Sequence, residues 1–166
     1  DLLLRHKRFA EAFGYVKQAC ELERPAGLLC LEYLQRCFPN RAAPEYRFAL
    51  ENLIHRTHSA AAMVELVEIT EQEQGAGDAE AMLLTYLRQK PNLKLFSALM
   101  GLRARGNHAV AGDAIMQLKG IVDSQIAQSA RFSCHGCGFE SRIMFWQCPS
   151  CRRWESLTIK TGLEGD

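Results

Sequence analysis

Residues 131–154 read RFSCHGCGFESRIMFWQCPSCRRW and contain two CxxC pairs, Cys134 with Cys137 and Cys148 with Cys151. The two residues inside each pair allow a tight bend, and the ten residues between the pairs allow a strand pair to bring both bends to one point. Four thiolates at one point are the ligand set of a structural zinc site. The sequence therefore predicts a metal centre with the ligands Cys134, Cys137, Cys148 and Cys151.

The identity of the metal stays open at this point. Zinc is the first expectation, but tetrahedral S4 ligation also suits a rubredoxin-like iron centre. His135 is a weaker candidate ligand, because four cysteines already complete the site. A segment this short buries too little apolar surface to fold alone, so the metal should supply the folding energy, about 10–16 kcal/mol in zinc-finger peptides.

We expect a small antiparallel sheet around the cysteines. Residues 139–146 alternate in the manner of a strand, and residues 154–160 form a second extended run. Gly138 can adopt the positive φ that aims backbone N–H groups at sulfur. Arg152 occupies the corresponding position after Cys151, where a glycine would avoid strain.

The chain before this segment has a helical period almost throughout, and its prolines at 25, 39, 44 and 91 mark helix ends. Residues 44–57 show the pattern best, because Tyr46, Leu50 and Leu53 lie on one stripe together with Ala49 and Ile54. The predicted helices cover residues 1–5, 9–23, 27–38, 44–57, 60–73, 78–90, 92–105 and 109–129.

Short loops between these helices predict antiparallel helical hairpins. Ala79 follows Ala12 by 67 residues, which is two periods of the tetratricopeptide length of about 34 residues. The Trp, Gly and Tyr signature of a first repeat helix is absent, so generic hairpins remain the alternative. We predict a mainly α fold, with a tetratricopeptide-like helical-hairpin array over residues 1–129 and a rubredoxin-like or zinc-ribbon β module over residues 130–166.

Composition narrows the class of function. The 166 residues carry a net charge of +1, which argues against a general nucleic-acid or anionic-membrane binder and favours a protein partner or small ligand. No apolar run reaches the roughly 18–20 residues needed to span a bilayer. The chain opens without Met or a signal-peptide pattern, so we expect a piece of a longer protein. Seven cysteines, four of them in CxxC pairs, indicate a reducing compartment.

The other candidate residues have plainer interpretations. Cys20, Cys30 and Cys37 are expected in the helical core, and His55 and His58 on the surface. Residues 57–87 hold six acids and no Lys or Arg, and residues 88–112 hold five bases and no acid. Solvated helix faces explain these runs best, with protein-partner or membrane contact as alternatives. No recognisable catalytic motif appears, so we expect a protein that is not an enzyme.

The runs at 131–140, 145–154 and 162–165, placed after a tetratricopeptide-like array, resemble the bacterial lipopolysaccharide assembly protein B family. The resemblance implies an N-terminal membrane anchor, cytoplasmic repeats at the inner membrane, and a rubredoxin-like module packed against the repeats. This chain would then lack the anchor and the earliest repeats. The family acts as an adaptor that works with the membrane protease FtsH to promote degradation of the LpxC deacetylase.

The resemblance carries the metal ligands over onto the four CxxC cysteines and carries over no partner-contact residue. Self-association of the chain is left open. Two other classes also stay open: a redox module that uses iron, and a zinc ribbon that stacks bases on Trp146 and Trp154 beside Arg152 and Arg153. We expect no nucleic-acid binding, because the residues of the small sheet should be needed for packing.

Overall fold

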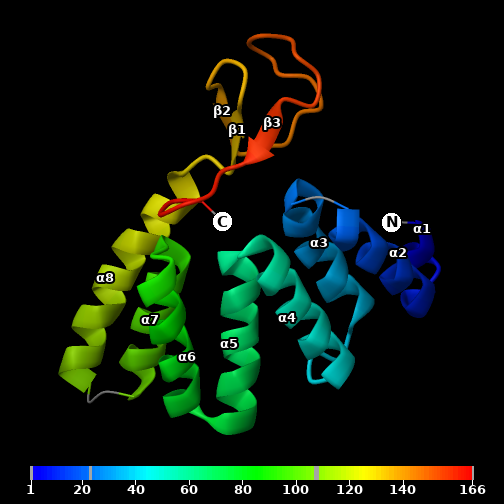
Figure 1. The fold of residues 1–166 in the computed structure, drawn as a ribbon. Coiled ribbons are helices and arrows are strands. Elements are labelled where there is room, and N and C mark those ends of the chain that lie inside the picture. The colour runs from blue at the N-terminus through cyan, green and yellow to red at the C-terminus, as the bar shows by residue number, and fades with distance from the viewer. Residues whose placement is uncertain (1, 23, 107–108, 166) are drawn as a thin grey trace. The chain divides into compact units, whose positions relative to one another are not determined.

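A computed structural model describes residues 2–22, 24–106 and 109–165 of the chain (Figure 1). It is mainly helical and ends in a small antiparallel sheet, which confirms the predicted fold class. The chain divides into two compact units, Asp1–Gly75 and Ala76–Asp166. The helices are α1 (Leu2–Arg5), α2 (Phe9–Leu22), α3 (Arg24–Cys37), α4 (Pro44–Thr57), α5 (Ala60–Gln74), α6 (Ala76–Gln89), α7 (Leu93–Gly106) and α8 (Ala109–Gln128).

Each predicted helix corresponds to an observed one, with the largest difference at the start of α3. We expected α3 to begin at residue 27, but it begins at Arg24. Pro25 therefore lies in its first turn, where the missing N–H has no intrahelical partner to lose. The assignment of these hairpins to tetratricopeptide repeats stays a prediction. The boundary predicted between residues 129 and 130 also stays a prediction, and it lies inside the second unit.

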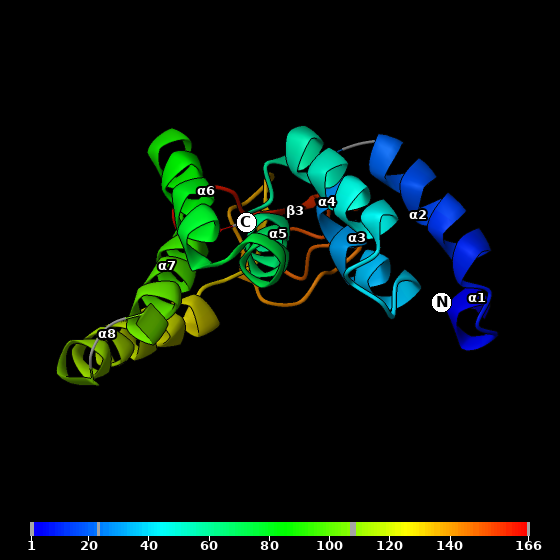
Figure 2. The ribbon, with the colours of Figure 1, turned by 90° about the horizontal axis from the view of Figure 1, so that it is seen from below.

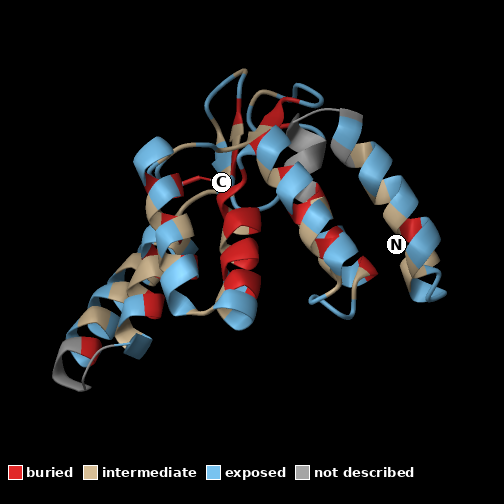
Figure 3. Cartoon of the chain, turned by 60° about the horizontal axis from the view of Figure 1, so that its bottom comes forward, coloured by how far each residue is buried: buried red, intermediate tan, exposed pale blue. Residues whose placement is uncertain are grey.

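The first unit is built on the stripe predicted for α4. Tyr46, Leu50 and Leu53 are buried there, with Ala49 and Ile54 partly buried against the same core. The turn after α4 is short because His58 takes φ 53° and ends the helix, and the hydroxyl of Ser59 accepts the Ala62 N–H that opens α5. Most of α5 is buried, as the red colouring in Figure 3 shows.

A buried carboxylate ties three helices of this unit together. Glu65 on α5 is only 8% exposed, and its Oε1 accepts from the Tyr46 hydroxyl at 2.9 Å and from Arg41 at 2.8 Å. Its Oε2 accepts from Gln35 Nε2 on α3 at 2.7 Å. Burial and this hydrogen bond to Glu65 raise the pKa of Tyr46 well above its usual range. Part of the acidic run over residues 57–87 is therefore used inside the fold.

The helices of the second unit pair closely. Figures 1 and 2 show α7 and α8 side by side, and a Cβ at Gly101 would lie only 3.2 Å from Cε of Lys119. Asp123 on α8 accepts from Lys119 and from the Ser97 hydroxyl, and both bonds lower its pKa. Arg103 on α7 pairs with Glu80 on α6 at 2.6 Å, so the basic run is also used in part within the fold.

The sheet differs from the prediction in number and length of strands. It has three strands in the order β2-β1-β3, namely β1 (Phe132–Cys134), β2 (Glu140–Ser141) and β3 (Leu157–Ile159). The prediction missed β1, which is central and carries Phe132 and Cys134 into the module core. The strand expected over residues 139–146 shrinks to β2, because the Ser141 hydroxyl accepts from the Ile143 N–H and the chain turns there.

The C-terminal segment returns from the sheet to the start of α7. The Asn92 side-chain amide donates to the carbonyls of Gly162 at 2.9 Å and Gly165 at 3.2 Å, and the Leu93 N–H donates to the Leu163 carbonyl at 2.8 Å. Gly162 has φ 108°, and a Cβ at Gly165 would lie 2.2 Å from the Lys160 carbonyl oxygen. Both positions therefore require glycine.

No helix in the part of the chain that the structure describes combines the length and the apolar character needed to cross a bilayer.

Candidate metal centre

The two CxxC turns have the same backbone hydrogen bonds. In the first turn the Gly138 N–H donates to the Cys134 carbonyl at 2.8 Å, and in the second the Arg152 N–H donates to the Cys148 carbonyl at 2.9 Å. The N–H of each leading cysteine also pairs with the chain five residues later. Cys134 donates to the Phe139 carbonyl and Cys148 to the Arg153 carbonyl. The two turns therefore have the same hydrogen-bond pattern, and each turn contributes two sulfurs to the cluster.

The residue that follows each turn lies in the left-handed region. Gly138 has φ 74° and Arg152 has φ 60°. A residue with a Cβ pays about 1–2 kcal/mol for this conformation, whereas glycine does not. The structure thus confirms that Arg152 occupies a position suited to glycine.

The four sulfurs meet at one point. All four Sγ atoms lie within 4.8 Å of one another, and the pairs Cys134–Cys151 and Cys137–Cys148 are each 3.7 Å apart. Zinc–sulfur bonds of about 2.3 Å give a tetrahedron with S···S edges of about 3.8 Å. A disulfide would need about 2.05 Å instead. The spacing of the sulfurs therefore fits a four-coordinate metal, and among the described residues no other His, Cys, Asp or Glu group has this arrangement.

Hydrogen-bond donors around the sulfurs favour the thiolate form that a metal needs. The Ser156 hydroxyl lies 3.3 Å from Cys134 Sγ, and the Gly136 N–H donates to the same sulfur at 3.4 Å. The hydrogen bond with Ser156 and the Gly136 N–H donor lower the pKa of Cys134 to about 6 despite its burial. The backbone N–H of Phe139 lowers the pKa of Cys137 in the same way.

The pKa of Cys151 shifts in the opposite direction from those of Cys134 and Cys137. The backbone N–H of Arg153 lowers the pKa of Cys151, but burial and the neighbouring thiols outweigh this donor and raise the pKa to about 11. Neighbouring negative charges at this distance oppose ionisation of Cys151, and a bound cation would remove that opposition. The donor set therefore suits a divalent or trivalent metal with soft-ligand preference, which includes both zinc and iron.

The site lies at the edge of the module core. Cys134 and Cys148 are buried with Phe132 and Leu157, whereas Cys137 is exposed and Cys151 is half-buried. Two ligands therefore serve also as core residues, and the exposed side gives a metal a route of entry.

The comparisons with known proteins agree with this geometry. A family described as "Rubredoxin metal binding domain" matches residues 132–158, the segment that contains all four cysteines. The chain is 26% identical over 159 residues to lipopolysaccharide assembly protein B of Escherichia coli K12, across 95% of this chain. It is 30% identical over 93 residues to the protein of that name from Haemophilus influenzae, across 55% of this chain.

Along most of its length the chain is similar in sequence to lipopolysaccharide assembly protein B. The match covers 41% of the Escherichia coli protein and 24% of the Haemophilus influenzae protein, so the chain spans well under half the length of either relative. Both relatives are named for an assembly role and neither for a catalysed reaction. The resemblance inferred from residues 131–165 is therefore confirmed.

The remaining candidate residues lie outside the centre. His135 donates its backbone N–H to the Ser156 carbonyl and does not join the sulfur cluster. Cys30 and Cys37 are buried in the first unit as expected, and burial raises the pKa of Cys37. The Cys20 side chain lies outside the described residues. His58 forms the end of α4, and His55 lies in its last turn.

One expectation about the module is wrong. We expected the residues of the two predicted strands, 139–146 and 154–160, to be needed for packing, but Trp146 and Trp154 within these ranges are each 70% exposed. Phe139 and Met144 pack against the module core instead. The Arg153 side chain lies over Gly136, where a Cβ would come within 3.0 Å of Arg153 Cδ.

Sequence reasoning missed two residues that support the centre. Ser156 contacts Cys134 through its hydroxyl, and no spacing rule marks a lone serine for this role. Asn92 links the end of the module to α7, and it also accepts the Lys94 N–H at 2.8 Å as a helix cap. Only the capping role of Asn92 could have been predicted from sequence, because an asparagine directly before a helical period commonly caps the N-terminus of a helix.

Proposed function

We propose that this chain is part of a non-enzymatic adaptor that acts in lipopolysaccharide assembly. The observation that carries the proposal is the similarity to lipopolysaccharide assembly protein B over 95% of the chain. Helical hairpins support it, because such arrays present broad surfaces that hold segments of other proteins. The chain's contribution would be to position macromolecules rather than to break bonds.

The finer proposal concerns the partners. The adaptor would bind the membrane protease FtsH and the LpxC deacetylase and bring them together at the cytoplasmic side of the bacterial inner membrane. This rests on the family resemblance of residues 131–165 and on the helical hairpins before them.

The four cysteines would hold zinc, with iron as the alternative at the same site. When bound, the metal supplies a rigid tetrahedral node that fixes both turns, and no redox or hydrolytic step is assigned to it. From this node β3 leads to the tail that hydrogen bonds to Asn92, so a loaded centre would stiffen the connection between the module and α7.

The test uses Cys148→Ser, with Ser150→Ala in the same turn as the matched control because Ser150 is exposed and is not a ligand. Metal content is measured together with the binding of purified FtsH and LpxC. The proposal expects the first variant to lose metal and adaptor binding and the control to keep both. Unchanged binding after metal loss would refute a role of the module, and failure of the unaltered chain to bind either protein would refute the adaptor.

A second candidate function has one observation in its favour, the exposure of Trp146 and Trp154, which lie on segments paired by the Gln147–Trp154 bridge in a stretch that also holds Arg152 and Arg153. Exposed aromatic rings beside a cation can stack nucleic-acid bases. Labelled single-stranded oligonucleotides test it. A salt-dependent affinity that falls in a Trp146→Ala, Trp154→Ala double variant would support this function, and no binding at low salt would exclude it.

A further inference from the structure

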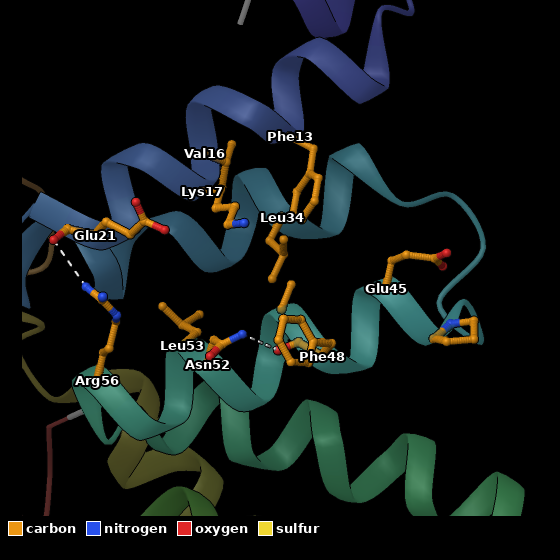
Figure 4. Close-up of a pocket in the computed structure, with 12 residues that line it drawn as sticks. Phe13, Val16, Lys17, Glu21, Leu34, Glu45, Phe48, Asn52, Leu53 and Arg56 are labelled. Atoms are coloured by element: carbon orange, nitrogen blue, oxygen red, sulfur yellow. Dashed lines mark hydrogen bonds between the residues drawn. The ribbon is translucent and has the colours of Figure 1, made fainter.

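An apolar groove lies within the first unit, with α2 and α4 as its walls and α3 as its floor (Figure 4). Its volume is about 610 Å³. Phe13, Val16, Leu34 and Leu53 form its apolar surface, and the Phe48 ring stands at its edge with 64% of its surface exposed. The groove is also lined by Lys17, Glu21, Pro44, Glu45, Ala49, Asn52 and Arg56.

The polar groups on the rim indicate what kind of molecule the groove accepts. Lys17 and Arg56 offer donors, and Glu21 and Glu45 offer acceptors. Asn52 Nδ2 donates to the Phe48 carbonyl, which leaves its Oδ1 as a further acceptor. Peptide backbones carry donors and acceptors in equal number, so a mixed rim matches them. A fatty-acid carboxylate offers only acceptors, so it would pair with Lys17 and Arg56 but leave Glu21 and Glu45 without a donor.

The distribution of charge along the rim gives the occupant a direction. Arg56 lies beside the end of α2, where its Nη1 donates to the Glu21 carbonyl at 3.1 Å, and Lys17 stands one turn of α2 away, so this end holds two cations against the single carboxylate of Glu21. Glu45 lies at the opposite end of the groove, in the first turn of α4 (Figure 4). From residue 45 to residue 56 the helix rises about 17 Å, the length of about five residues of extended chain.

We propose that this groove binds an extended peptide segment of about five residues from a protein partner. The segment carries large apolar side chains that cover Phe48 and the groove floor, and an acidic residue that faces Lys17 and Arg56. This inference rests on the proposed adaptor function, because it locates one surface through which the adaptor holds another protein.

The probe for the test is a phage-displayed library of random heptapeptides, selected on the intact 166-residue chain. Selected peptides are then synthesised, and their affinities are measured by fluorescence anisotropy. We expect enrichment of peptides that combine Leu, Ile or Phe with one Asp or Glu. Phe48→Ser should weaken their binding about tenfold or more, since exposed aromatic anchors dominate such interfaces.

Tyr15→Ser is the matched control for Phe48→Ser. Tyr15 lies on α2, is 67% exposed and does not line the groove, so its replacement should leave affinity unchanged. Lys17→Glu should reverse the charge preference and select peptides with Lys or Arg in place of the acid. Equal effects of Phe48→Ser and Tyr15→Ser, or an enriched set without acidic residues, would overturn the proposal.

Other occupants would appear in the same experiments. Phe48-dependent binding of dodecanoate would assign the groove to a lipid chain, and Phe48-dependent dimerisation in sedimentation would assign it to a second copy. Either result overturns the peptide proposal. Failure of the peptide proposal can be told apart from failure of the adaptor function. If Phe48→Ser still binds FtsH and LpxC, the groove proposal alone is rejected. If the chain selects peptides but binds neither protein, the adaptor function alone is rejected.

Discussion

The α4–α5 hairpin and the metal module depend on different interactions for their stability. The hairpin lies in a cluster of six buried residues, Leu34, Tyr46, Leu50, Leu53, Ala62 and Ile69, with further apolar side chains around them. The module has a cluster of only four, and two of these are the cysteines Cys134 and Cys148. Apolar burial can hold the hairpin, whereas the module needs its sulfurs to be bound by a metal.

This difference means that the two regions should fail separately and under different conditions. Loss of metal should act on the module first, and a cavity in the helical core should act on the first unit first. The chain offers a convenient readout, because both of its tryptophans lie in the module. The anisotropy of tryptophan fluorescence therefore reports on the module, while far-ultraviolet circular dichroism reports mainly on the helices.

Metal removal should give the largest effect. Apparent metal binding of about 10–16 kcal/mol is typical for small zinc modules, which exceeds what a four-residue cluster can replace. We expect extraction of the metal, or Cys148→Ser, to lower the tryptophan anisotropy sharply while most helical dichroism remains. Metal is counted with a chromogenic chelator after thiol modification. A metal-free chain whose module stays ordered would contradict the claim that the module depends on its metal while the hairpin depends on apolar burial.

Leu50→Ala should give the next largest effect, in the other region. Leu50 is completely buried in α4, and removal of such a side chain costs about 2–5 kcal/mol. Thermal melts followed by circular dichroism should show lower stability of the helices, with metal content unchanged. The control is Asn52→Ala, an exposed position of the same helix, which should shift the midpoint little. Metal loss in Leu50→Ala would show that the regions do not fail separately.

The same contrast explains how much could be predicted from sequence. The helices follow from periodicity and proline, because each hairpin is fixed by neighbours close in the chain. The four ligands follow from spacing, because metal geometry leaves few alternatives for two CxxC pairs. The central strand β1 was missed, since a strand of three residues that ends on a cysteine is too short to show a period of its own.

Interactions between distant residues could not be predicted. Asn92 bonds to Gly162 across 70 residues, and Gln35 bonds to Glu65 across 30, so no local pattern contains both partners. The prediction that Trp146 and Trp154 are needed for packing was also wrong, because both are exposed. Alternation shows that a strand has two faces but does not show which face is covered. The contacts and the exposure of these residues are set by tertiary structure rather than by local propensity.

Asn92 joins the C-terminal segment to α7 together with the Leu93 N–H, and its replacement should have an intermediate effect. Asn92→Ala removes the cap on the Lys94 N–H and both bonds to the tail, at a cost of about 2–3 kcal/mol. Asn92→Asp keeps the cap but loses the tail bonds. We expect both variants to retain metal, and limited proteolysis should cut the tail in both. A tail that stays protected in Asn92→Asp would show that the cap, not the amide donor, holds the connection.

The smallest effects on stability should come from substitutions in the two CxxC turns. These substitutions compare the two turns of the metal module with each other. Gly138 and Arg152 both take the left-handed backbone conformation, but only Arg152 has a side chain. Gly138→Ala should weaken the module by about 1–2 kcal/mol, because alanine must take the left-handed conformation. Arg152→Gly should strengthen it by less, about 0.5–1 kcal/mol, because glycine removes the strain but gives the unfolded chain more freedom. Competition with a zinc chelator measures both.

The double variant Gly138→Ala, Arg152→Gly moves the glycine from the first turn to the second and is the stricter test. If the turns are equivalent, its zinc affinity should lie between those of the two single variants, with the effects adding. Effects of the same sign in the two single variants would show that the side chain of Arg152 contributes more than its backbone costs. In that case the hydrogen-bond pattern that the turns share would not make them energetically alike.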